Sequence, residues 1–402
     1  MAKPKIRFNG YTEDWEQRKV GELLEERNEQ APMSEDYPLM AFIANQGVAP
    51  KGERYDRSAL VNDETGKKYK RTEFGDFIYS SNNLETGSIG LNKYGNACIS
   101  PVYSIFKPTG KAELDFLGRR FLRKDFINEM VRWRQGVVYG QWKIHETDFM
   151  KIEVRIPSVD EQKKIGQYFD SLDNLITLHQ RKCEQTKTLK KYMLQKMFPQ
   201  DGEKVPQIRF EGFTEDWEQR ELSEIALQTY GGGTPKTANE EFWKGNIPWI
   251  QSSDLIEERL FNVKPRKYIS QEAISKSSTK LVPQNSIAIV TRVGVGKLAF
   301  MPFSYATSQD FLSLSELKIE PKFAVYALYK MMRLVSNEVQ GTSIKGITKD
   351  ELLAKEILIP DCEEQKKIGA YLHNLDHLIT LHQRKCDELK EVKKFMLQNM
   401  FV

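Results

Sequence analysis

The nine residues LITLHQRKC occur twice without change, at 175–183 and at 378–386. Each copy places a histidine and a cysteine four positions apart, His179 with Cys183 and His382 with Cys386, in a chain of only 5 histidines and 4 cysteines. Spacing of four puts both side chains on one face of a helix, and imidazole nitrogen with thiolate sulfur is a zinc ligand pair. Two facing copies would supply four ligands, so a shared metal site is the first hypothesis.

A helical seam explains the same residues without a metal. In both copies, residues at alternating steps of four and three form a stripe typical of a coiled coil, with one irregularity near Thr186. The stripe consists of Ile165, Phe169, Leu172, Ile176, His179 and Cys183, and of Ile368, Leu372, Leu375, Ile379, His382 and Cys386. Occasional polar layers in such seams fix the register of the helices, usually without metal. We therefore favour a polar layer and predict no metal site.

The nine residues belong to a longer duplication. Segment 157–198 aligns without gaps on 360–401, with 27 identical positions out of 42, and PKIRFNGYTEDWEQR (4–18) aligns on PQIRFEGFTEDWEQR (206–220). A unit of about 200 residues is thus repeated, with a leading segment, a body and a near-identical tail. The bodies, about 19–156 and 221–359, have different sequences.

The predicted fold class is α+β, with two mixed α/β bodies, two long helices in an antiparallel coiled coil and an internal pseudo-twofold repeat. Short β-rich runs such as DFIYSS and NSIAIVTRV alternate with helical stretches such as FAVYALYKMMRLV. Ser158 with Glu161, and Asp361 with Glu364, fit capping boxes. From Asp160 to Phe198 a helix would run roughly 58 Å. The expected divisions are 1–157 (leading segment and first body), 158–198 (first long helix), 199–205 (linker), 206–360 (leading segment and second body) and 361–402 (second long helix).

Composition limits the class of protein. With 40% hydrophobic residues the chain can build real cores, and its net charge of +4 permits a polyanionic partner without requiring one. Cys98, Cys183, Cys362 and Cys386 are too few and too irregularly spaced for a disulfide framework. The start MAKPKIRFNG lacks a signal-peptide core, and no apolar run is long enough to span a membrane. We expect a soluble, cytoplasmic protein.

Motifs for catalysis are missing. RVGVGK (292–297) has Thr291 where a Walker A glycine belongs and no following serine or threonine, so we predict a tight turn. Neither body has a glycine-rich cofactor loop with an Asn-Pro-Pro-Tyr motif, and PDCEEQK (360–366) is explained by helix capping. No catalytic residue is therefore assigned. Basic segments such as KKYKR (67–71), RRFLRK (119–124) and KPRKY (264–268) suit phosphate contacts, although each alone is typical of ordinary surface.

Over essentially its whole length the sequence resembles the specificity (S) subunits of type I restriction-modification systems. The resemblance rests on RFEGFTEDWEQR, on GGGTPKTANEEFWKGNIPWIQSSDL (231–255) and on GTSIKGITKDELLAKEILIP leading into EEQKKIGAYLHNLDHLI. The first body has no Gly-Gly-Thr-Pro start.

The resemblance implies a non-catalytic subunit in which each body is a target recognition domain for one half of a split DNA site. It implies that the helices set the spacer and dock two methyltransferase (M) subunits, which bind S-adenosylmethionine, while restriction (R) subunits use ATP and magnesium; the chain itself needs no cofactor. It also implies that residues on loops recognise the sequence of double-stranded DNA, and we call these residues readers. These are Gln46, Arg54, Asn82, Asn83, Tyr139, Gln141 and Lys143 in the first body, and Lys236, Gln251, Ser252, Ser253, Arg292, Lys297, Gln309, Ser343 and Lys345 in the second.

Two other classes stay open. One is a coiled-coil scaffold that joins two protein-binding domains, which predicts no DNA affinity. The other is the recognition half of a nuclease or methyltransferase, which would need some 200–300 further residues for a catalytic domain. Methylation mapping with a methyltransferase partner separates all three.

Overall fold

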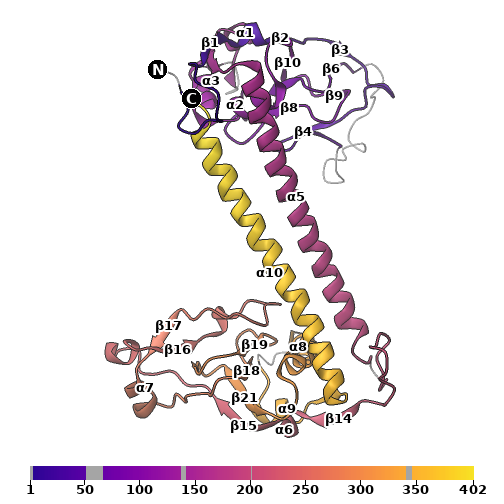
Figure 1. The fold of residues 1–402 in the computed structure, drawn as a ribbon, viewed down its shortest axis with the longest axis vertical. Helices are drawn as coiled ribbons and strands as arrows, with labels where there is room; N and C mark the ends of the chain where they lie inside the picture. The colour runs from indigo at the N-terminus through magenta and orange to yellow at the C-terminus, as the bar shows by residue number, and fades with distance from the viewer. Residues whose placement is uncertain (1–2, 51–66, 137–141, 201, 341–345) are drawn as a thin grey trace. The chain divides into compact units, whose positions relative to one another are not determined.

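A computed structural model of the chain describes residues 3–50, 67–136, 142–200, 202–340 and 346–402. These residues divide into two compact units (Figure 1). Unit 1 contains residues 1–178 and 385–402, and unit 2 contains residues 179–384. In the described part of the chain, no helix is long and apolar enough to cross a membrane.

Unit 1 combines short strands with short helices before the first long helix begins. Its elements are β1 (Glu16–Lys19), α1 (Val20–Leu23), β2 (Leu24–Glu26), β3 (Gln30–Ala31), β4 (Ala41–Ile43), β5 (Gly47–Ala49), β6 (Tyr69–Thr72), β7 (Phe77–Tyr79), β8 (Ile89–Leu91), β9 (Ala97–Ile99), β10 (Ser104–Pro108), α2 (Leu114–Phe121), α3 (Lys124–Arg132), β11 (Gln135–Gly136), β12 (Trp142–Lys143), α4 (Glu146–Phe149), β13 (Glu153–Ile156) and α5 (Val159–Lys196), which continues into unit 2.

Unit 2 has the same kinds of element with a longer central helix. Its elements are β14 (Glu218–Glu221), α6 (Leu222–Ile225), β15 (Ala226–Gly231), the 3-10 helix η4 (Glu240–Trp243), β16 (Ile247–Ile250), the 3-10 helix η5 (Ser252–Asp254), β17 (Lys267–Ile269), α7 (Gln271–Lys276), β18 (Ser286–Val290), β19 (Leu298–Met301), β20 (Ala306–Thr307), β21 (Phe311–Leu317), α8 (Pro321–Gln340), α9 (Lys349–Leu353), β22 (Glu356–Ile359) and α10 (Cys362–Asn399), which continues into unit 1. The mixed α/β character predicted from the sequence is confirmed.

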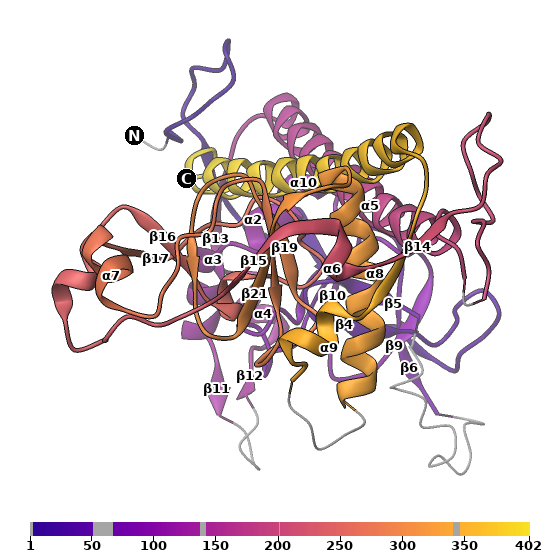
Figure 2. The same cartoon turned by 90° about the horizontal axis from the view of Figure 1, so that it is seen from below.

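Both bodies are built on antiparallel sheets with the same strand order, although their sequences differ. The order is β2-β10-β7-β8 in unit 1 and β15-β21-β18-β19 in unit 2. A second sheet follows in each unit, β3-β6-β9 and β17-β16-β20. Figure 2 shows α7 grouped with β16 and β17, while α8 and α9 lie at the other end of unit 2.

The repeated segments make equivalent contacts in the two units. Arg7 in the leading segment forms a two-pronged ion pair with the fully buried Glu161 on α5, at 2.7 Å from each carboxylate oxygen. Arg209 binds Glu364 on α10 in the same way, at 2.8 Å. Both glutamates were predicted to complete capping boxes. Ser158 does accept from the Glu161 N–H at 3.4 Å, but the carboxylate is committed to Arg7 instead.

Each unit also closes its core with the end of the other repeat's helix. In unit 1, Phe401 stacks on Phe116 with ring centroids 5.3 Å apart and meets Trp15 edge-on at 6.3 Å. In unit 2, Phe198 stacks on Phe323 at 5.6 Å and meets Trp217 edge-on at 5.8 Å. Aromatic rings of this size bury a large apolar area, so the tips of both helices contribute directly to the two cores.

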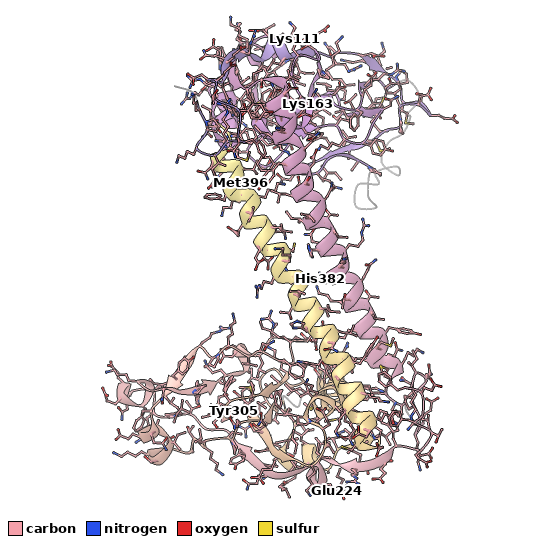
Figure 3. The ribbon with its side chains drawn as sticks, viewed as in Figure 1. Lys111, Lys163, Glu224, Tyr305, His382 and Met396 are labelled. Carbon is pink, nitrogen blue, oxygen red and sulfur yellow. The ribbon has the colours of Figure 1, made fainter. Side chains whose placement is uncertain are left out.

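The predicted seam residues differ in burial. Ile165, Phe169, Leu172 and Ile176 are buried in unit 1, as are Ile368, Leu372 and Leu375 in unit 2. Cys183 and Cys386 are buried, whereas His179, His382 and Ile379 are half-buried. His382 and Met396 lie along α10 (Figure 3). In unit 2 the Cys183 thiol lies 3.8 Å from the Ile379 carbonyl oxygen, to which it donates.

Candidate nucleic-acid interface

Antiparallel pairing brings four loops of unit 2 to one edge of its central sheet. Gly231, at the end of β15, pairs with Leu312 on β21, and Val290, at the end of β18, pairs with Phe311. Beyond the strands, the Thr291 N–H donates to the Asp310 carbonyl at 2.7 Å. The loops that follow β15 and β18 therefore meet the turn that precedes β21.

The second sheet adds the end of β16 to the same edge. The Ser308 N–H donates to the Ile250 carbonyl and the Gly233 N–H to the Thr307 carbonyl, both at 2.9 Å. The Trp249 indole donates to the Gly233 carbonyl at 3.0 Å. A Cβ on Gly232 would lie 1.8 Å from the Ser308 carbonyl oxygen, so this approach requires glycine. We call segments 231–236, 251–254, 291–297 and 308–310 the loop edge of unit 2.

Most of the readers predicted in the second body lie on this loop edge. Lys236, Ser253, Arg292 and Gln309 are exposed, and Gln251, Ser252 and Lys297 are half-buried. The Thr234 hydroxyl donates to the Gln309 side-chain oxygen at 3.3 Å, and the Lys297 ammonium lies 3.5 Å from the Ser252 carbonyl. Ser343 and Lys345 lie outside the described residues.

Gln251 and its neighbours also have a structural role. The Gln251 N–H donates to the Asp254 carboxylate at 2.9 Å, which closes the single turn of η5. Arg266, on a different loop, holds the same turn by donating to the Ser253 carbonyl at 2.9 Å and by pairing with Asp254 at 3.2 Å. Arg266 was not among the predicted readers, although the basic segment KPRKY contains it; its side chain is two-thirds exposed beside the loop edge.

The RVGVGK segment forms the tight turn predicted between two strands. Gly294 and Gly296 adopt φ values of +91° and +101°, which are strained for other residues, and the Val290 N–H donates to the Lys297 carbonyl at 2.8 Å. The turn leaves Val293 72% exposed. Val293 was not among the predicted readers, all of which carry a polar or charged group that can form hydrogen bonds.

Unit 1 has an equivalent loop edge, formed by segments 44–47, 80–88, 100–103 and 142–144. Ser104, at the start of β10, pairs with Tyr79, at the end of β7, so turn 100–103 and loop 80–88 lie together. The Asn45 N–H donates to the Gly87 carbonyl at 2.9 Å, which brings the β4–β5 turn to the same place. Turn 100–103 precedes β10 as turn 308–310 precedes β21, and it leaves Val102 70% exposed, similar to the exposure of Val293.

The readers predicted in the first body are only partly described. Gln46, Asn83 and Lys143 are exposed at the loop edge of unit 1, and the Lys143 ammonium lies 3.7 Å from the Glu146 carboxylate. The Asn82 side-chain oxygen accepts from the Trp142 N–H at 2.6 Å, and Ser81 accepts from the Ile144 N–H at 3.0 Å. Asn82 therefore holds the β11–β12 ribbon against the loop. Arg54, Tyr139 and Gln141 lie outside the described residues.

Two buried titratable groups with shifted pKa values, Tyr305 and Lys70, lie in or beside the sheets of the bodies. Burial raises the pKa of Tyr305 to about 12, against hydrogen bonds to Ser286 and Ser313, and Tyr305 lies within unit 2 (Figure 3). Burial lowers the pKa of Lys70, whose ammonium donates to the Tyr103 carbonyl at 2.9 Å. In the ranges that the structure describes, no group of three or more histidine, cysteine, aspartate or glutamate side chains could hold a metal ion.

Comparison with known proteins gives the chain a family. The model of the "Type I restriction modification DNA specificity domain" family matches residues 12–188 and again residues 214–391. The chain belongs to this family. Specificity subunits of this family are not enzymes by themselves, and the family implies no cofactor held by the subunit alone.

Known relatives of this specificity-family chain include two proteins of Methanocaldococcus jannaschii. The type I restriction enzyme MjaIX specificity subunit is 29% identical over 199 residues, an alignment that covers 46% of this chain and 44% of the relative. The putative type I restriction enzyme MjaX specificity subunit is 22% identical over 95% of this chain and 91% of the relative. The chain thus spans less than half of the first relative and nearly all of the second.

A solved structure supports the same fold for the specificity-family chain. It is the crystal structure of the S subunit of a type I restriction-modification system from M. genitalium, with a TM-score of 0.62 and 13% sequence identity. The match covers 100% of this chain and 99% of that one.

Proposed function

We propose that the two bodies read the two halves of a split, asymmetric target in double-stranded DNA, each through its loop edge. One observation carries this proposal: on sheets of the same strand order, the loop after β7 or β18 lies beside the turn before β10 or β21 in both units, but with different side chains. Two such edges with different chemistry suit two different half-sites, because hydrogen-bonding and apolar groups at base edges determine sequence preference.

The long helices would set the spacer between the half-sites. We propose an antiparallel coiled coil with a pseudo-twofold repeat, together with the divisions 1–157, 158–198, 199–205, 206–360 and 361–402. In unit 1, Lys393 near the end of α10 pairs with Asp173 near the start of α5. In unit 2, Lys190 near the end of α5 pairs with Asp376 near the start of α10, at 2.6 Å. A helix pair of roughly 50–60 Å limits the spacer to about 15–17 base pairs at about 3.4 Å per pair, and half-sites near one helical turn apart are expected.

The helices also expose matched apolar residues that would dock two copies of one partner. The exposed residues are Leu175, Leu178, Val392 and Phe395 in unit 1, and Leu378, Leu381, Leu189 and Tyr192 in unit 2. Each member of the first set has its repeat counterpart in the second, 203 positions away. The partners would be two methyltransferase subunits, which bind S-adenosylmethionine and methylate adenine N6. Restriction subunits that use ATP and magnesium would join this core in the cytoplasm.

Reconstitution with a methyltransferase subunit tests the proposal. Methylation of a DNA library by the complex, followed by mapping of N6-methyladenine, should give a split sequence with one modified adenine in each half. Replacement of the second body by that of another specificity subunit should change only one half of the target. Methylation at no split sequence, or a change in both halves, would contradict the proposal.

A further inference from the structure

The two long helices differ where they contact the bodies. Asp170 and His373 occupy equivalent positions in the repeated tails, as do Phe169 and Leu372, within an alignment that is identical at 27 of 42 positions. Other contacts in the same region are shared. Gln162 accepts from the Glu113 N–H in unit 1 and Gln365 from the Glu320 N–H in unit 2, each at 2.9 Å. On each helix, contacts that are common to both units therefore lie next to contacts that occur in one unit only.

In unit 1 the contact without a counterpart in unit 2 is an arginine that pairs with two carboxylates. Arg119 on α2 reaches Asp170 at 2.5 Å and Asp173 at 3.0 Å, with its side chain only 12% exposed. Its guanidinium also lies over the ring of Phe169, 5.4 Å from the centroid. Arg119 thus contacts two residues of α5, Phe169 and Asp170, that differ from their counterparts on α10.

In unit 2 a tyrosine and a phenylalanine replace the arginine. Tyr326 stands six residues after Glu320, as Arg119 stands six after Glu113, and its hydroxyl donates to Asp376 at 2.6 Å. Phe261 meets the His373 ring edge-on at 4.5 Å and lies 5.9 Å from Tyr326. Asp376 is the repeat counterpart of Asp173, so one acidic residue is common to both units and the second is replaced by an aromatic contact.

We propose that positions 169–170 on α5 and 372–373 on α10 match each helix to its own body and determine which body the helix accepts. On α10, Arg119 would face His373 in place of a carboxylate and would lose half of its ion pairing. On α5, Phe261 would face the Asp170 carboxylate in place of an imidazole ring. The first mismatch leaves a poorly hydrated arginine with one carboxylate fewer, and the second removes the ring that packs on Phe261. Each is expected to destabilise the exchanged unit.

A double-mutant cycle on the full chain tests this matching. His373→Asp and Tyr326→Arg each convert one member of the unit 2 pair into its unit 1 counterpart, and each alone should lower the Tm. The double variant places an arginine between two carboxylates, so its Tm should exceed the value expected from adding the two shifts. Ser171→Asn, which makes the same kind of exchange at an exposed position of α5, should leave the Tm unchanged. Strictly additive shifts would overturn the inference.

Exchange of the bodies gives an independent test if the single variants do not fold. One chain carries the two bodies in exchanged order with the helices unaltered. The other carries Phe169→Leu, Asp170→His, Leu372→Phe and His373→Asp in addition. We expect limited proteolysis to cleave the second chain several-fold more slowly than the first. Equal cleavage rates would show that the helices accept either body.

Discussion

In unit 2 the imidazole rings of His179 and His382 face each other, with their Nδ1 atoms 3.1 Å apart. A hydrogen bond at this distance needs one ring to donate and the other to accept, so it requires that at least one ring be neutral. Burial lowers the pKa of His382, and His179 and Lys182 lower it further; burial also lowers the pKa of His373.

Stability of unit 2 should therefore decrease in mild acid. A histidine whose pKa is lower in the folded state binds protons more readily when unfolded, so its contribution is complete above the unfolded pKa of about 6.5 and is lost as the pH falls below it. We expect the Tm to fall by a few degrees more between pH 7 and pH 5 in the native chain than in a His179→Asn/His382→Asn variant. Parallel pH profiles for the two chains would contradict this.

Loss of the leading-segment arginine should be costly. Arg7→Ala leaves the Glu161 carboxylate buried without its partner, which is expected to cost about 3–5 kcal/mol of unfolding free energy. The Arg18→Ala variant removes exposed ion pairs with Glu16 and Glu22 and should destabilise the chain far less than Arg7→Ala. Denaturant titration of both variants measures the difference in unfolding free energy. Similar decreases in the two variants would show that the buried pair stabilises the chain no more than an exposed pair does.

Gln309→Ala should change sequence preference at one half-site only. Its side chain is exposed at the loop edge, and loss of a base contact typically costs about 1–3 kcal/mol at a single position. Competition binding of the methyltransferase complex to variant duplexes measures this. Lys276→Ala, on α7 and paired with Glu272, serves as the matched control and should change neither affinity nor preference. Equal weakening on every sequence would assign Gln309 to the phosphates.

Val293 and Val102 should contact thymine methyl groups, because an exposed apolar side chain among polar readers suits that group. Replacing thymine by uracil in one half-site removes the methyl. We expect weaker binding by the native complex at one or more thymines of each half-site. Val293→Ala should abolish the thymine–uracil difference in one half-site and leave the other unchanged. A native complex that binds thymine and uracil duplexes equally would refute this assignment.

The exposed apolar residues of the helices should bind the partner without supporting the fold. Leu178→Gln and its repeat counterpart Leu381→Gln alter exposed positions, so the Tm of the free chain should remain within a few degrees. Gel filtration with the methyltransferase subunit should show one bound copy for each single variant and none for the double variant. Two bound copies in the double variant would place the docking surface elsewhere.

Local patterns in the sequence predicted the helices better than their contacts. The four-and-three spacing predicted a helix from Asp160 to Phe198, and the structure has one at Val159–Lys196. The capping-box rule misassigned Glu161, because its partner Arg7 lies 154 positions away and no local rule includes it. The repeated RF in the two leading segments was the available signal.

The common sheet order could not be predicted from the two bodies. Strands such as β7 and β8 have three residues each, too few for a periodic pattern, and β2 pairs with β10, which lies far along the chain. The loop readers were placed on loops by analogy, but Asn82 could not be recognised as a support for Trp142 before the β11–β12 ribbon was known. Exposure of Val102 and Val293 likewise follows from turn geometry rather than residue type.

The packing of Phe401 against Trp15 and Phe116 has a consequence for biosynthesis. Unit 2 is continuous, from 179 to 384, and all of its residues can assemble as soon as they leave the ribosome. Unit 1 lacks Met400 and Phe401, both almost fully buried, until the entire second unit has been synthesised. The body made first is thus the body completed last, and during translation its open core is the surface that chaperones would have to protect.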